Sequence, residues 1–321
     1  LSEFLADNSN GLRDNFASRS DWIELFNRSD TTADLDGYFL TDDSSKLTKW
    51  RLPAVTLPGR GFLIVWASGM DQTNPSAPLH TNFKLSTNGE YLALVDPRTN
   101  VVSEFAPTYP PQRSDVSYGR DQTSPTLVGY YATPTPGAAN SISGAGFAPE
   151  PVFSLPGGLY TNGTLTVTIS AAAGTLRYTT DGSPPTTASA VYAGTIAITE
   201  STGIQARVFQ AGLLPSAIVV QTYNVLGSGA VGFSSNLPLL IINTSGQGIA
   251  AEARTLATVT AIEPFRGRAG VATPPAFQGN CQIEIRGQSS TMFPKLGYNL
   301  ELNDANGNDV DAPLLGLPSE S

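Results

Sequence analysis

Short apolar runs rich in β-branched and aromatic residues alternate with clusters of Asp, Asn, Gly and Pro along this 321-residue chain. Three such runs lie in its first part, at residues 22–26 (WIELF), 61–66 (GFLIVW) and 91–95 (YLALV). Runs of this length that end in turn-forming residues are typical of strands rather than helices. The pattern therefore predicts an all-β protein whose first part folds as a Greek-key sandwich.

The same alternation continues through the rest of the chain. Residues 164–169 (TLTVTI), 175–179 and 202–209 predict a second, smaller sandwich, and the unbroken apolar run at 237–242 predicts a buried strand. We therefore expect tandem immunoglobulin-like β-sandwiches followed by a short mostly-β segment. The expected boundaries are a sandwich at 1–140, a linker at 141–150, a sandwich at 151–226, a linker at 227–236 and the last segment at 237–321.

Composition agrees with this pattern and narrows the partners. Gly (31) and Pro (24) supply many turns, and only 14% of the residues are charged. The net charge of −9 would repel a phosphate backbone, which disfavours nucleic acid and favours cations. One Cys and one His are too few for a zinc cluster with four such ligands. No apolar run reaches the roughly 18 residues of a membrane helix, so no membrane span is predicted.

Five motifs in the first part of the chain carry a family resemblance. They are residues 2–8 (SEFLADN), 20–27 (SDWIELFN), 40–43 (LTDD), 49–53 (KWRLP) and 134–140 (PTPGAAN). Together they resemble a bacterial lamin-tail domain. The resemblance implies an immunoglobulin-like sandwich of the kind found in secreted multidomain bacterial proteins, and it implies no catalytic residue.

A second resemblance covers the middle of the chain. Residues 178–185 (YTTDGSPP), Tyr192 and 206–212 (ARVFQAG) are similar to the small β-sandwich at the C-terminus of chitobiases and hexosaminidases. Asp181 and Gly182 fit a turn between strands, since both tolerate a positive φ. In that family the module accompanies catalytic domains and is not itself catalytic.

The last part resembles the opening of a CotH-type kinase domain. The motifs are residues 281–290 (CQIEIRGQSS), 293–295 (FPK), 298–302 (YNLEL) and 314–318 (LLGLP). The resemblance implies that Lys295 would approach a nucleotide phosphate in a complete parent domain. In that family the metal-binding acidic residues lie further downstream. We therefore predict that this chain is not an enzyme, and that it is an excised or processed part of a longer protein.

Two loops rich in acidic and amide oxygens are candidate calcium sites. The first contains Asp7, Asn8, Asn10 and Asp14, with Asp21 closing the shell, and it is the stronger candidate. The second, weaker candidate contains Asp304, Asn306, Asn308 and Asp311. Calcium takes about six to eight oxygen ligands, which such loops can supply. The alternative interpretation is that both are turns stabilised by Asx side chains.

Other chemistry-bearing residues receive structural interpretations. We expect His80 to lie at the surface and Cys281 to lie in a core, and we expect Trp22 and Trp66 to be buried rather than to form a sugar-stacking platform with Trp50. The paired carboxylates Asp42/Asp43 and Asp21/Glu24 are not expected to act as an acid/base pair, because the sequence gives no separation or cleft for them.

The leading functional hypothesis is a non-catalytic part of a secreted or cell-surface bacterial protein. Its modules would act as structural, adhesive or assembly units, including fibres, with other copies of the chain or surface proteins as partners. One alternative is the N-terminal targeting part of a CotH-like kinase. A second alternative is a polysaccharide-binding module, since relatives of residues 151–226 accompany chitin-degrading enzymes.

Overall fold

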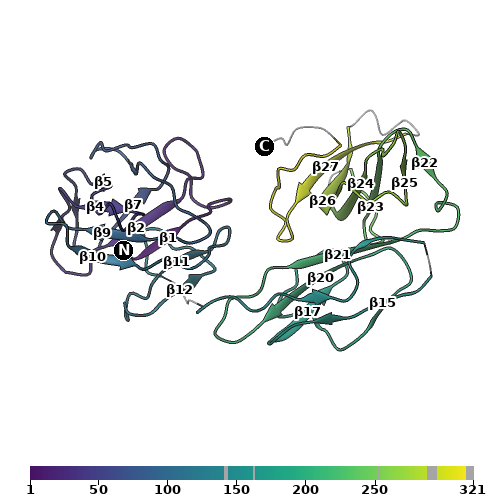
Figure 1. Ribbon diagram of the computed structural model, residues 1–321, viewed down its shortest axis with the longest axis horizontal. Helices are drawn as coiled ribbons and strands as arrows, with labels where there is room; N and C mark the ends of the chain where they lie inside the picture. Colours follow the sequence, from purple (N-terminus) through teal and green to yellow (C-terminus); the bar gives the residue numbers. More distant parts are fainter. Residues whose placement is uncertain (141–143, 162, 252, 288–294, 316–321) are drawn as a thin grey trace. The chain divides into compact units, whose positions relative to one another are not determined.

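The computed structural model describes residues 1–140, 144–161, 163–251, 253–287 and 295–315. Every regular element in these ranges is a β-strand, which confirms the all-β prediction (Figure 1). The chain divides into two compact units. Unit 1 contains Leu1–Gly146 with Gly212–Leu214, and unit 2 contains Phe147–Ala211 with Pro215–Ser321. The predicted linker at 227–236 lies within unit 2.

Unit 1 contains two larger sheets. The six-stranded sheet has the order β12 (Val128–Tyr131), β11 (Ser117–Arg120), β1 (Glu3–Leu5), β2 (Trp22–Phe26), β7 (Phe62–Trp66), β8 (Leu79–His80). The four-stranded sheet has the order β10 (Val101–Phe105), β9 (Leu92–Val95), β4 (Phe39–Thr41), β5 (Trp50–Arg51). A two-stranded sheet joins β3 (Ala33–Asp34) to β6 (Thr56–Leu57).

An aromatic cluster joins the two larger sheets of unit 1. The ring of Phe4 on β1 lies 5.2 Å from that of Phe105 on β10 and 4.5 Å from that of Tyr109. Ile23 on β2 is fully buried and lies opposite Phe4 in the strand register. Alternate residues of a strand point to opposite faces. Glu3 and Glu24 therefore lie on the other face of the six-stranded sheet.

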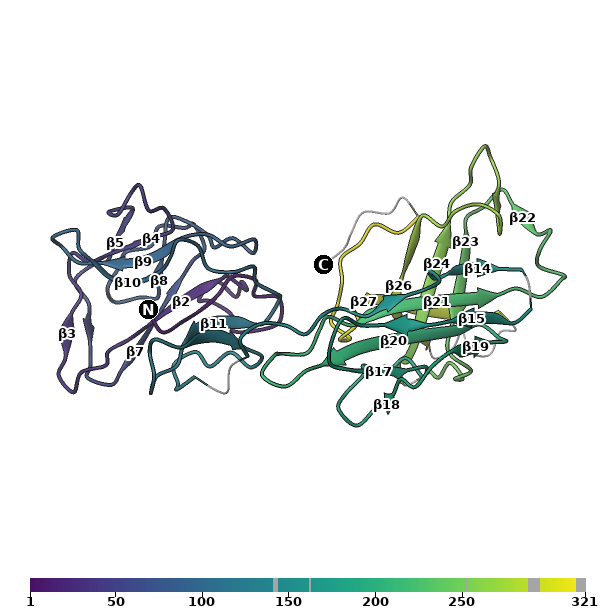
Figure 2. The same ribbon diagram turned by 60° about the horizontal axis from the view of Figure 1, so that its bottom comes forward.

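Unit 2 begins with a small sandwich. Its five-stranded sheet has the order β14 (Gly158–Tyr160), β21 (Val219–Val225), β20 (Thr202–Phe209), β17 (Thr175–Thr179), β18 (Ala190–Val191). Two short pairs complete it: β13 (Val152–Phe153) with β16 (Ile169–Ser170), and β15 (Leu165–Val167) with β19 (Ile196–Ile198). The core includes Ile204, Val208, Tyr223, Val167 and Ile198. Figure 2 shows the long strands β20 and β21 side by side in this sheet.

The rest of unit 2 is a second sheet, ordered β23 (Leu239–Asn243), β24 (Thr255–Ile262), β26 (Phe277–Arg286), β27 (Gly297–Asn303), with a short pair of β22 (Ser234–Ser235) and β25 (Ala269–Gly270). One face of this sheet is apolar and contains Val259, Cys281, Ile283 and Leu302. Cys281 is 1% exposed, as expected of a core cysteine, and burial raises the pKa of its thiol to about 12.

Candidate functional site

Two fully buried carboxylates face each other across β1 and β2. The register places Glu3 opposite Glu24, and the two side chains are each 0% exposed. Ser2 Oγ donates to Glu24 Oε1 at 2.6 Å, and the Gly137 amide donates to Glu24 Oε2 at 2.6 Å. The Thr135 amide and hydroxyl donate to Glu3 at 3.1 and 2.8 Å. We call this group the Glu3–Glu24 clasp.

Both carboxyl groups of the clasp have raised pKa values. The pKa of Glu24 is raised to about 7, chiefly by burial and also by the Glu3 charge, while the hydrogen bonds from Ser2 and Gly137 oppose the rise. Burial also raises the pKa of Glu3. All the donors are groups of the protein itself. They include residues of the 134–140 motif, which lies more than a hundred residues after Glu3 and Glu24 in the sequence. The clasp therefore fastens that motif to the sheet.

The first candidate calcium loop is held by its own hydrogen bonds. Asn8 is buried, and its amide nitrogen donates to the carbonyls of Leu12 and Ser20 at 2.7 and 2.8 Å. Asp14 Oδ1 accepts from the amides of Phe16 and Ser18 at 2.9 and 3.0 Å. The Asp14 contact with Phe16 is that of an Asx turn, and the Asn8 amide holds the two ends of the loop through their carbonyls.

The remaining residues of that loop separate into two groups. The exposed Asn10 donates from its side chain to Asp115 at 3.0 Å. Burial raises the pKa of the half-buried Asp21 to about 6, and the charge of Asp7 adds to the rise, although the backbone amides of Asn8 and Leu85 oppose it. Asp7 and Asp21 are thus close enough for their charges to interact. Within the described ranges, no group of three His, Cys, Asp or Glu side chains is placed to hold a metal ion. The calcium site stays a prediction.

The second loop repeats a turn that also occurs in unit 1. Asp304 Oδ1 accepts from the amides of Asn306 and Asn308 at 2.8 and 2.9 Å, and its Oδ2 accepts from the Asn308 side chain at 3.0 Å. Asp96 makes the same contacts with residues 98 and 100, at 2.8, 2.8 and 2.9 Å. The fourth residue has a positive φ in both turns, at Gly307 and Thr99. Asp311 is exposed and takes no part in this turn.

His80 is the clearest correction to the sequence interpretation. It is 0% exposed rather than at the surface. Its ring nitrogens contact Ser68 Oγ at 2.9 Å and Asn15 Oδ1 at 2.8 Å, and the ring lies 6.4 Å from that of Trp66. Burial lowers the pKa of His80, against the opposing charge of Asp14. Its partners are distant in sequence, so the local sequence could not reveal its burial.

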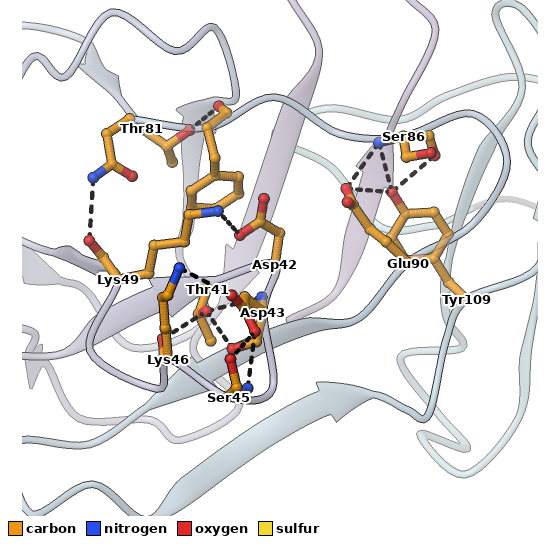
Figure 3. A network of polar contacts seen from close by, with 12 residues as sticks. Thr41, Asp42, Asp43, Ser45, Lys46, Lys49, Thr81, Ser86, Glu90 and Tyr109 are labelled. Carbon is orange, nitrogen blue, oxygen red and sulfur yellow. Dashed lines mark hydrogen bonds and ion pairs between the residues drawn. The ribbon is translucent and has the colours of Figure 1, made fainter.

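A polar network connects the loops around β4 and β5 (Figure 3). Asp42 forms an ion pair with Lys49 at 2.5 Å, and Asp43 forms a longer one with Lys46 at 3.6 Å. The buried Thr41 hydroxyl donates to the carbonyl of Lys46 at 2.9 Å. Each carboxylate has its own lysine, so the two act separately.

The same figure shows a second group, in which Glu90 Oε1 accepts from Tyr109 OH at 3.0 Å and from the Ser86 amide at 2.8 Å. The three tryptophans are buried, at 0% for Trp22, 2% for Trp50 and 6% for Trp66. They therefore form no exposed stacking platform. The polar network around Asp42 and Asp43 and the group around Glu90 both connect loops of unit 1 and stabilise its fold.

A hollow of about 720 Å³ in unit 1 is lined by residues that include Val102, Glu104, Arg120 and Gln122. The Arg120 guanidinium lies 4.7 Å from the Phe105 ring and donates to the carbonyls of Pro125 and Glu104. The Arg120 side chain is therefore used to connect β10 with β11.

Two family models match the chain. The Lamin Tail Domain matches residues 1–108, and the Chitobiase/beta-hexosaminidase C-terminal domain matches residues 155–221. No curated protein and no solved structure gives a significant match. The first two resemblances are confirmed, and both matched domains are non-catalytic modules.

The resemblance of residues 237–321 to a CotH-type kinase stays a prediction, because both matched ranges end before it. Lys295 is exposed in the described part of the chain. Residues 288–290, 293–294 and 316–318 of the same motifs lie outside the described residues. Among the described residues, no helix is long and apolar enough to cross a membrane.

Proposed function

We propose that this chain is a modular, non-catalytic part of a secreted or cell-surface protein, and that it assembles with other copies of itself. The observation that carries the proposal is the use of its acidic groups. Its carboxylates accept hydrogen bonds from donors of the protein itself. This holds for the Glu3–Glu24 clasp, for Asp14 in the first candidate calcium loop and for Asp304 in the second. These groups hold a scaffold together, as a spacer or assembly module requires.

The edge strand β27 is the surface through which copies would pair. It contains seven residues and is the last strand of its sheet among the described residues, next to β26. The segment that follows contacts its end, where Val310 and Asp309 pair with Leu302 and Asn303. Its Gly297, Tyr298 and Asn299 are exposed, and Tyr298 is 49% exposed. An edge strand presents backbone donors and acceptors that another strand can use. A charged side chain on an edge strand suppresses such pairing, which is why a lysine on β27 can test it.

Sedimentation equilibrium over a wide concentration range tests the assembly. The unmutated chain should show a concentration-dependent rise in mass, and Tyr298→Lys should abolish it. Val152→Lys is the matched control, because Val152 is also an exposed strand residue (63%) but lies on β13. A single monomer mass at every concentration for the unmutated chain would refute the assembly.

A further inference from the structure

One rung of the last sheet is polar on all four of its strands. The register places Asn243, Thr258, Asn280 and Asn303 opposite one another on β23, β24, β26 and β27. Opposed residues have Cβ atoms about 5 Å apart and lie on one face of the sheet. The four side chains therefore form a continuous polar row, which we call the polar rung. It lies on the face opposite the apolar cluster around Val259 and Cys281.

Three oxygens of the polar rung are buried without a hydrogen-bond partner among the described residues. They are Thr258 Oγ1, Asn280 Oδ1 and Asn303 Oδ1. Gln205 Oε1, on strand β20 of the small sandwich, is in the same condition, and the Gln205 side chain is 5% exposed. A buried polar atom without a partner loses its hydrogen bonds to water and gains none in return, so four in one place require an explanation.

The amide nitrogens of Gln205, Asn280 and Asn303 already have acceptors. Gln205 Nε2 donates to the Gly182 carbonyl at 2.9 Å, and Asn280 Nδ2 makes a longer contact of 3.4 Å with the Asp304 carbonyl. Asn303 Nδ2 contacts the Gly307 carbonyl at 3.5 Å. These contacts determine which end of each amide is the oxygen, so the oxygens without partners are acceptors.

The four residues with unpartnered oxygens line one cavity of about 300 Å³ in unit 2; they are Gln205, Thr258, Asn280 and Asn303. Val220, Leu256 and Pro184 add apolar surface to the same lining. Gly203 also lines it, and a Cβ atom built at Gly203 would lie 3.7 Å from Thr258 Cγ2. The missing side chain at Gly203 therefore leaves room above the polar rung. A volume of this order is at the lower end of the range for small-molecule sites.

The unpartnered atoms specify the chemistry of an occupant. The cavity is lined by three amide oxygens that need donors, on Gln205, Asn280 and Asn303, and by the Thr258 hydroxyl, which can donate as well as accept. An anion would meet acceptors rather than donors in this lining, and a cation would meet neutral oxygens with no free carboxylate beside them. A hydroxyl group both donates and accepts. Asp304 lines the cavity too, but its carboxylate accepts from Asn306 and Asn308.

We propose that this cavity binds a small, neutral, polyhydroxylated ligand of the size of a single sugar ring. Gln205 and three residues of the polar rung recognise its hydroxyl groups, and Val220 and Leu256 contact its C–H surface; the three residues are Thr258, Asn280 and Asn303. This proposal does not rest on the assembly through β27, although Asn303 lies at the end of that strand.

Saturation-transfer NMR on the full chain tests the site. The probes are free glucose, galactose, mannose and N-acetylglucosamine, together with their disaccharides. At least one free sugar should bind, and Gly203→Leu, which fills the cavity, should abolish its signal. Thr258→Val keeps the shape but removes one hydroxyl, and it should weaken binding up to about tenfold. Binding of disaccharides alone would assign the site to the end of a longer glycan.

Gln278→Ala is the matched control. Gln278 lies on the same strand and face as Asn280, but it donates to Thr260 Oγ1 at 3.3 Å and does not line the cavity. Its removal should leave the affinity unchanged. The proposal is overturned if no sugar gives a signal even at concentrations well above millimolar. It is also overturned if Gly203→Leu and Thr258→Val both bind the sugar as tightly as the unmutated chain. It is also overturned if sodium, potassium or calcium, but no sugar, shifts the side-chain amide resonances of Asn280 and Asn303.

Discussion

Replacing Glu24 by Gln should change how the stability of unit 1 depends on pH. The pKa of Glu24 rises from 4.5 to about 7 on folding, so the folded state binds this proton more tightly than the unfolded state. Its contribution to the free energy of unfolding is fully present below about pH 4.5 and is lost as the pH rises through about 7. A shift of this size corresponds to about 3 kcal/mol, at about 1.4 kcal/mol for each pKa unit.

Gln has nearly the shape of a protonated Glu and carries no charge at any of these pH values. Its oxygen can accept from the Gly137 amide, and its nitrogen can donate to the Ser2 hydroxyl, which rotates to accept. Relative to the unmutated chain, Glu24→Gln should therefore gain about 3 kcal/mol of unfolding free energy between pH 4.5 and pH 8.

Urea unfolding followed by tryptophan fluorescence measures this difference, because all three Trp residues lie in unit 1. Glu104→Gln, at an exposed carboxyl group of the same unit, controls for the loss of one negative charge. If the stability curves of Glu24→Gln and the unmutated chain run parallel from pH 4.5 to pH 8, Glu24 does not titrate in this range and the argument is wrong.

Three further predictions use the same tryptophan signal. Thr99→Gly should stabilise unit 1 by about 1 kcal/mol, because a β-branched residue is strained at a φ of 67°; equal or lower stability would contradict this. His80→Phe should destabilise it by about 1–3 kcal/mol, since Ser68 and Asn15 lose their partner; an unchanged urea midpoint would show that these contacts contribute little. If the first loop binds calcium, calcium should raise the melting temperature and Asp7→Asn with Asp21→Asn should remove the rise; an unmutated chain that melts identically in calcium and in EDTA would leave the loop as a turn.

The sequence predicts the all-β fold because strand formation depends on local alternation. The run WIELF at 22–26 is apolar at four of its five positions, and β2 forms there with residues of both faces buried. Glu24 lies in phase with Trp22 and Phe26, where an apolar residue would be expected, so the run itself marks this carboxyl group as unusual. Its partner Glu3 and its donors at Thr135 and Gly137 depend on strand register and on a distant loop, so composition could not place them.

The polar rung was missed for a related reason. Asn243, Thr258, Asn280 and Asn303 are unremarkable at their own positions, and no short motif contains two of them. They come into one row only through the register of three successive strand pairs. A register change of one residue would turn each side chain to the other face. The site therefore depends on the pairing of strands, which a single sequence does not fix.

Two kinds of polar group in this chain imply opposite roles. The carboxylate of Asp304 suggested a calcium ligand in the sequence, but its oxygens accept from the amides that close its own turn. The same turn at Asp96 occurs in the other unit with a different second, third and fourth residue, so the Asp and the closing Asn suffice to form it. Asn280 and Asn303 have no charge, yet their oxygens remain without donors among the described residues. Unused hydrogen-bonding capacity, rather than charge, therefore indicates where this protein would bind a ligand.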